Sequence, residues 1–154
     1  MKTHSDLKIK IRKCTQDDYD WCYELSKGNM KPYVEKYWNK WNPKLFTSNF
    51  KVERVNIVEL DKKPIGFYEI EFRAELGIIH GIQICESYRN KGIGTKIIAL
   101  IEDEFRNKGI KTSRLRVFVD NPAVRLYQRL GYVVIEEADY YTKLGTIVMA
   151  KQLF

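Results

Sequence analysis

The chain has 154 residues, of which 44% are hydrophobic and 13% are aromatic. This length and composition are typical of one globular domain with its own core, so we expect a single domain over residues 1–154. The first residues contain no apolar signal region, and no segment approaches the roughly 20 apolar residues of a membrane-spanning helix. We therefore expect a soluble cytoplasmic protein without a membrane partner.

The formal net charge is +7, and the excess of basic residues lies mainly in the first fifty residues and over residues 85–130. No run of five or six like charges marks a nucleic-acid-binding tail. An anionic cofactor would explain a local basic surface as well as DNA or RNA would. Nucleic acid is therefore not expected to be the primary partner.

The three cysteines, Cys14, Cys22 and Cys85, lie far apart in a chain that has only two histidines. They form neither a CxxC pair nor a Cys/His cluster with metal-ligand spacing. We expect reduced, buried thiols and no metal site.

The N-terminal segment predicts a strand followed by a helix. Residues 7–13 alternate between apolar and basic side chains, which is the period of a half-exposed strand. Thr15 and the acidic residues after it predict the start of a helix. The apolar stripe of this helix is Tyr19, Cys22 and Leu25.

After Gly28-Asn29, the rest of the chain is a succession of helices and strands with short connections. In chain order the predicted elements are a second helix over 33–41 that Pro43 ends or kinks, strands over 52–60, 65–73 and 78–85, a helix over 93–109, a strand over 115–119, a helix over 121–130, and strands over 131–135 and 145–151. The short turn at 61–64 is of the kind that joins antiparallel neighbours.

This order predicts an α+β fold with a mixed, mostly antiparallel central sheet of about seven strands and helices on both faces. The final strands leave an edge at which two copies could pair as a homodimer. The sequence leaves the oligomeric state open.

The segment from Arg89 to Thr95 is the most informative part of the chain. It runs from a strand end through a basic, glycine-rich turn into an amphipathic helix. The first amides of a helix have no partner within it and lie at the positive end of the helix dipole, so an anion can bind them. Gly92 and Gly94 leave these amides accessible, and Arg89 and Lys91 add positive charge. The alternatives are a pyrophosphate site and a purely structural turn.

Two signatures point to one family. The first is RxxGxG from Arg89 to Gly94, whereas the nucleotide motifs GxGxxG and GxxxxGKS/T are absent. The second, within residues 117–132, is a strand, Asn121 at a helix start, and the ending LYxxxGY from Leu126 to Tyr132. Together, in this order, they resemble the GCN5-related N-acetyltransferase (GNAT) family, whose hallmark is an R/QxxGxG/A turn between the fourth strand and the third helix.

The resemblance implies an acyltransferase that moves an acetyl group from acetyl-CoA to an amine by direct transfer through a ternary complex. It implies that the turn binds the pyrophosphate mostly through main-chain amides, that the preceding strand pairs with the pantetheine arm, and that an asparagine hydrogen-bonds the same arm. The implied cofactor-binding residues are Arg89, Asn90, Lys91, Gly92, Ile93, Gly94 and Thr95 in the turn, Ile82, Gln83 and Ile84 in the strand, and Asn121.

Tyr127 matches the position of the family's general-acid tyrosine, which would protonate the departing thiolate. The alternative is a core tyrosine on the apolar stripe of its helix. The base stays open between three residues. His80 lies on a strand where relatives place a polar relay, and Glu69 and Glu71 share one face of the preceding strand, where paired acids are ordinarily solvated.

The acceptor amine cannot be read from the sequence, and the acetyl group is itself implied only by the resemblance. The competing hypothesis is a non-catalytic module that binds or senses acyl-CoA. Tyr127 is the feature that favours an enzyme over such a module.

Overall fold

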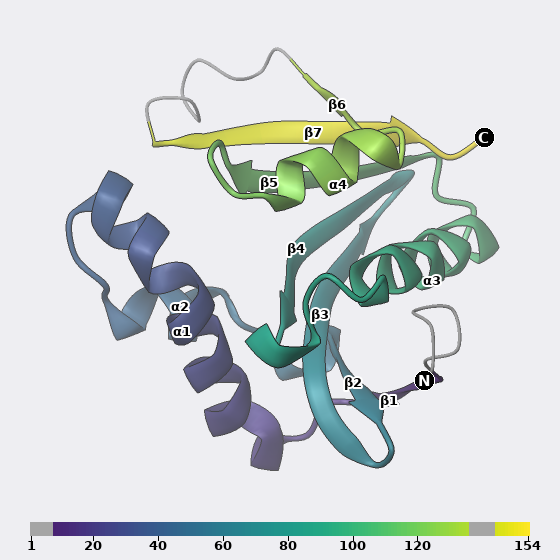
Figure 1. Cartoon of the computed structure of the whole chain (residues 1–154). Coiled ribbons are helices and arrows are strands. Elements are labelled where there is room, and N and C mark those ends of the chain that lie inside the picture. The colour runs from purple at the N-terminus through teal and green to yellow at the C-terminus, as the bar shows by residue number, and fades with distance from the viewer. Residues whose placement is uncertain (1–7, 136–143) are drawn as a thin grey trace. The chain divides into compact units, whose positions relative to one another are not determined.

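The computed structural model describes residues 8–135 and 144–154 of the chain. The strands in this part are β1 (Ile9–Lys13), β2 (Val55–Leu60), β3 (Lys63–Arg73), β4 (Leu76–Ile84), β5 (Thr112–Phe118), β6 (Val133–Val134) and β7 (Thr146–Gln152). The α-helices are α1 (Tyr19–Trp38), α2 (Pro43–Asn49), α3 (Ile93–Asn107) and α4 (Ala123–Arg129). The strands form one sheet in the order β1-β2-β3-β4-β5-β7-β6 (Figure 1).

The sheet is mixed. β2 pairs antiparallel with β1 and β3, and β7 pairs antiparallel with β5 and β6, whereas β4 and β5 are parallel. These pairings confirm the predicted α+β class with its mostly antiparallel, seven-stranded sheet.

The chain divides into two compact units, which are described separately below. Unit 1 comprises Met1–Glu69 and Gly81–Gly94, and unit 2 comprises Ile70–His80 and Thr95–Phe154. β3 and β4 run through both units. The expectation of a single domain stays a prediction.

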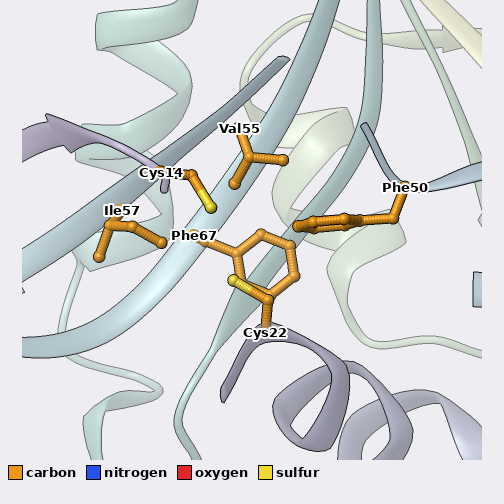
Figure 2. Close-up of a cluster of buried hydrophobic side chains, with 6 residues drawn as sticks. All are labelled: Cys14, Cys22, Phe50, Val55, Ile57 and Phe67. Carbon is orange, nitrogen blue, oxygen red and sulfur yellow. The ribbon is translucent and has the colours of Figure 1, made fainter. Parts of the chain in front are cut away.

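The core of unit 1 is a cluster of side chains from the residue after β1, from α1, from the segment after α2, and from the strands β2 and β3. Figure 2 shows these side chains converging: Cys14, Cys22, Phe50, Val55, Ile57 and Phe67. The rings of Phe46 and Phe50 stack at 4.6 Å on its border. Cys14 and Cys22 are free, buried thiols as predicted, whereas the prediction is wrong for Cys85, which is only half-buried.

The start of α1 follows the sequence prediction. The Asp18 carboxylate accepts the Thr15 main-chain N–H at 2.9 Å, within a short 3-10 turn over Gln16–Asp18 that leads into the helix. Arg12 donates to both carboxylate oxygens of Asp18, at 2.8 and 2.9 Å. The Arg12 guanidinium of β1 thus forms an ion pair with the Asp18 carboxylate, directly before α1.

The predicted break at Gly28-Asn29 is wrong, because α1 continues without interruption to Trp38 and contains Pro32. Its buried side chains, Cys22, Ser26 and Val34, lie on both sides of Gly28. Packing on both sides of the break therefore outweighs the weak local helix preference of glycine and proline.

The prediction that Pro43 ends or kinks a helix is also wrong, since Pro43 begins α2. Proline suits the first helical position, where its missing N–H costs no hydrogen bond. The Asn42 side chain caps this helix by accepting the Lys44 N–H at 3.0 Å.

In unit 2, the predicted apolar face of α3 is buried: Ile97, Ile101 and Phe105. The Phe105 ring contacts Phe72 edge-on at 5.6 Å, and a β-carbon at Gly77 would lie 2.5 Å from the same ring. Gly77 therefore permits β4 to approach this helix closely.

A buried polar network also joins α3 to β5, β7 and the segment before β6. The Tyr132 hydroxyl lies 2.7 Å from the Ser113 Oγ and donates to the Glu102 carboxylate at 3.0 Å. Lys151 donates to the other carboxylate oxygen at 2.9 Å. The buried charge of Glu102 is thus paired, as burial of a carboxylate requires.

The C-terminal elements agree with the predicted order. β7 is a full strand, but β6 is reduced to Val133–Val134 of the predicted 131–135. The predicted connection over 139–141 lies outside the described residues. No helix in the part of the chain that the structure describes is long and apolar enough to cross a membrane.

Candidate functional site

The ladder between β4 and β5 ends at the pair Ile79↔Leu115, although β4 continues to Ile84. Within the described residues, His80–Ile84 therefore have no register with β5. The segment includes Ile82, Gln83 and Ile84, the three residues that the family resemblance links to the pantetheine arm.

Only part of this segment faces away from β3. The Gln83 carbonyl lies so close to β3 that a β-carbon at Gly66 would be 2.5 Å from its oxygen, and the Cys85 N–H donates to the Ile65 carbonyl at 2.8 Å. Because main-chain groups alternate along a strand, those of Ile82 and Ile84 point away from β3. Of the three predicted strand residues, Gln83 directs its main chain to β3, and Ile82 and Ile84 present theirs on the opposite edge.

The predicted order of strand, glycine-rich turn and helix is present. Asn90 and Gly92 adopt left-handed backbone conformations, with φ of 61° and 79°, and α3 begins directly afterwards at Ile93. Left-handed residues in a turn make a concave arrangement of N–H groups that suits anions. Asparagine tolerates this conformation, and glycine adopts it without strain.

The remaining turn residues differ in what they expose. Lys91 and Thr95 are exposed, whereas the Ile93 side chain is 1% exposed and belongs to the core. Ile93 can thus contact a cofactor through its main chain alone. Arg89 is exposed, but its Nε donates to the Ile84 carbonyl at 3.3 Å and its Nη2 donates to Asn29.

Asn29 was missed by the sequence reasoning, which treated Gly28-Asn29 as a helix break. It lies inside α1, and its amide contacts the end of β4. The available signal was a polar residue of low helix preference in a helical segment, which does not by itself identify a partner.

In unit 2, Asn121 and Tyr127 lie before and within α4. The Asn121 Oδ1 accepts the Ala123 N–H at 2.9 Å, although the residue that directly precedes the helix is Pro122 rather than Asn121. Pro122 was predicted at the first helical position, so the helix begins one residue later than expected. The Asn121 Nδ2 is not used in this contact.

The Tyr127 side chain is 8% exposed, and its ring meets that of Tyr132 edge-on at 5.9 Å. Burial raises the pKa of Tyr127 to about 12. An ordinary tyrosine is also protonated at neutral pH, so this shift reports the burial of the phenol and does not by itself indicate a general acid. The same burial also agrees with the alternative of a core tyrosine.

The three candidates for the base have different surroundings. In unit 2, the His80 Nε2 lies 2.7 Å from the Glu71 carboxylate, which also accepts the Arg73 Nε at 2.6 Å. In unit 1, Glu69 is 7% exposed and accepts the Lys51 main-chain N–H at 3.3 Å. The expectation of solvated acids is thus wrong for Glu69, and Glu71 is the acid that the structure pairs with His80. Within the described residues, no group of His, Cys, Asp and Glu is suited to hold a metal ion.

Comparison with known proteins places these features in a family. The chain is 30% identical over 135 residues to an uncharacterized N-acetyltransferase of Methanocaldococcus jannaschii, a match that covers 79% of this chain. The chain spans 59% of the length of that protein.

Solved structures share the fold. PaiA N-acetyltransferase of Thermoplasma acidophilum, in complex with coenzyme A, matches with a TM-score of 0.74 and 21% identity, over 95% of this chain and 99% of that one. The ribosomal-protein-S18-alanine N-acetyltransferase of Escherichia coli matches with a TM-score of 0.70 and 21% identity, over 95% of this chain and 94% of that one. A model of the Acetyltransferase (GNAT) family matches residues 14–132. The chain belongs to the acetyltransferase (GNAT) family.

Proposed function

We propose that this chain is an N-acetyltransferase that uses acetyl-CoA as the acyl donor and an amine as the acceptor, with direct transfer in a ternary complex. The course of the chain from Ile82 to Gly94 carries the proposal. There, a strand segment without register to β5 leads through a left-handed turn into the start of α3. Membership of the GNAT family supports the same activity.

The residues of this segment suit coenzyme A. The pantetheine arm contains amide groups, which a strand edge such as that of Ile82 and Ile84 can pair. The pyrophosphate is anionic and suits the first amides of α3, with Arg89 and Lys91 nearby in sequence. A side chain at Gly92 would be strained at its φ of 79° and would add bulk beside those amides.

The chain must also move two protons. Bound acetyl-CoA supplies an activated thioester, and the acceptor ammonium must lose a proton before it can attack. We assign this step to His80. If its Nε2–H donates to Glu71, its Nδ1 carries the lone pair that accepts the proton. We assign protonation of the departing sulfur to the phenol of Tyr127, which lies in α4 at the position of the family's general-acid tyrosine.

Calorimetric titration with acetyl-CoA, together with a thiol-release assay over a panel of amines, tests the proposal. The panel contains a polyamine, an aminoglycoside, free lysine, and peptides that offer an N-terminal or a lysine amine. We expect acetyl-CoA to bind, ATP to bind at least tenfold more weakly, and one amine class to stimulate thiol release.

Gly92→Val provides the matched variant for the titration, and we expect it to raise the Kd for acetyl-CoA by at least tenfold. Binding without turnover of any amine would favour the acyl-CoA-sensing module instead. Absence of acetyl-CoA binding by the wild-type protein would refute both functions.

A further inference from the structure

The Asn29 side chain joins α1 to the end of β4 and to the start of the glycine-rich turn. Its Nδ2 donates to the Gln83 Oε1 at 3.0 Å and to the Ile84 carbonyl at 3.3 Å. Its Oδ1 accepts the Nη2 of Arg89, and the Arg89 Nε donates to the same Ile84 carbonyl at 3.3 Å. One side chain of α1 thus donates to the end of β4 and accepts from the first residue of the turn.

These contacts change what β4 can offer to a ligand. A carbonyl oxygen has two lone pairs, and the Ile84 carbonyl already receives two donors, from Asn29 and from Arg89. The Ile84 carbonyl lies on the strand edge that points away from β3. On that edge, the Ile84 N–H and the main chain of Ile82 have no register with β5 among the described residues.

The contacts also hold the Arg89 guanidinium in place. A free arginine loses rotamer entropy when it is ordered, whereas one already held by two protein acceptors loses less on binding an anion. The preorganised charge lies one residue before Asn90, at the entrance of the left-handed turn.

We propose that Asn29 is a positioning residue for the acyl donor. Asn29 and Arg89 together occupy the Ile84 carbonyl, on the edge of β4 that points away from β3. The pantetheine arm then forms hydrogen bonds only with the main chain of Ile82 and with the Ile84 N–H. This inference rests on the proposed function, because it concerns the strand and the turn assigned there to acetyl-CoA.

The test uses Asn29→Ala, Arg89→Ala and the double variant, with Glu24→Ala on the exposed side of α1 as the control. The Kd for acetyl-CoA is measured by calorimetry, and KM and kcat are measured with the best acceptor. We expect Asn29→Ala to raise Kd and KM for acetyl-CoA by about tenfold, with a smaller change in kcat at saturating donor. Glu24→Ala should bind as the wild type does.

The double variant distinguishes positioning from a general structural role. Asn29 acts partly through Arg89, so the two substitutions should not be additive. The Kd of the double variant for acetyl-CoA should be less than threefold higher than that of the single variant with the higher Kd. Asn29→Ala removes the side-chain hydrogen bonds to Gln83, Ile84 and Arg89, and the higher helix preference of alanine offsets part of this loss, so its melting temperature should fall only slightly.

Full additivity of the two substitutions, or wild-type affinity in Asn29→Ala, would overturn the inference and leave the proposed function intact. A wild-type protein that does not bind acetyl-CoA would overturn the proposed function, and this inference with it.

Discussion

Gly66→Ala tests whether the close approach of β3 and β4 fixes the strand segment assigned to the acyl donor. The added β-carbon would lie 2.5 Å from the Gln83 carbonyl oxygen, whereas ordinary contacts begin at 3.4 Å. The two strands must therefore separate by about 0.9 Å, the difference between these distances. The atoms that the β-carbon would meet belong to the main chain of Gln83 and Ile84, so no side-chain rotation relieves the overlap.

Overpacking of this kind typically costs 1–3 kcal/mol, and we expect a loss of about 2 kcal/mol in the free energy of unfolding. For a chain of this length that corresponds to a fall of about 4–8 °C in melting temperature. The displacement also moves Ile84, so the Kd for acetyl-CoA should rise by about tenfold in the folded variant.

Gly28→Ala is the control for this substitution. No atom lies within 4 Å of the β-carbon that it would add, and the residue is inside α1. Alanine is favoured over glycine in a helix by roughly 0.5–1 kcal/mol, so the melting temperature should rise slightly. The melting temperature and the Kd for acetyl-CoA of both variants are measured by calorimetry and compared with those of the wild type. A Gly66→Ala protein that melts and binds like the wild type would refute the close-approach argument.

Three further predictions follow from the same structure. Tyr127→Phe keeps the ring and its contact with Tyr132, so the Kd for acetyl-CoA should stay within twofold while kcat falls about 10²-fold. Full turnover under conditions where chemistry is rate-limiting would show that Tyr127 is a core residue and not the general acid. In steady-state assays, His80→Ala should lower kcat by about 10²-fold and Glu71→Gln by about tenfold, whereas Glu69→Gln should have little effect. The reverse order of effects would identify Glu69 as the general base. Arg12 lowers the pKa of Asp18 to about 2, so this pair stabilises the fold above pH 4, and its contribution is lost as the pH falls towards 2. Because Arg12 is partly exposed, we expect a contribution of about 1 kcal/mol, and urea unfolding of Asp18→Asn should show a smaller loss of stability than the wild type over this pH range.

The sequence predicted those features that depend on local patterns. The period-two alternation before Thr15, the four-residue spacing along α3 and the glycine at position 92 each act within a few residues of the chain, and the structure has the corresponding strand, buried helix face and left-handed turn. It failed where packing overrides local preference. Gly28 and Pro32 predict a break, yet α1 passes through both because its buried residues lie on either side.

The candidate site divides in the same way. The residues of the glycine-rich turn are neighbours in sequence, so a motif could identify them. The pairing of His80 with Glu71 required the register of β3 against β4, and the capping of the Ile84 carbonyl required a helix residue far from it in the chain.

Asn29 illustrates why such residues escape a reading of the sequence. An asparagine beside a glycine has the composition of a turn, and only the position of β4 next to α1 turns it into a donor for a strand carbonyl. A strand edge that binds a ligand must stay unpaired along part of its length, yet its last carbonyl must be satisfied once the strand ends. In this chain two side chains from distant segments satisfy that carbonyl, and one of them is the arginine of the RxxGxG motif itself. The motif arginine therefore donates to the protein's own main chain in the structure. If it also contributes to donor binding as proposed, that contribution depends on Asn29, which the motif does not include.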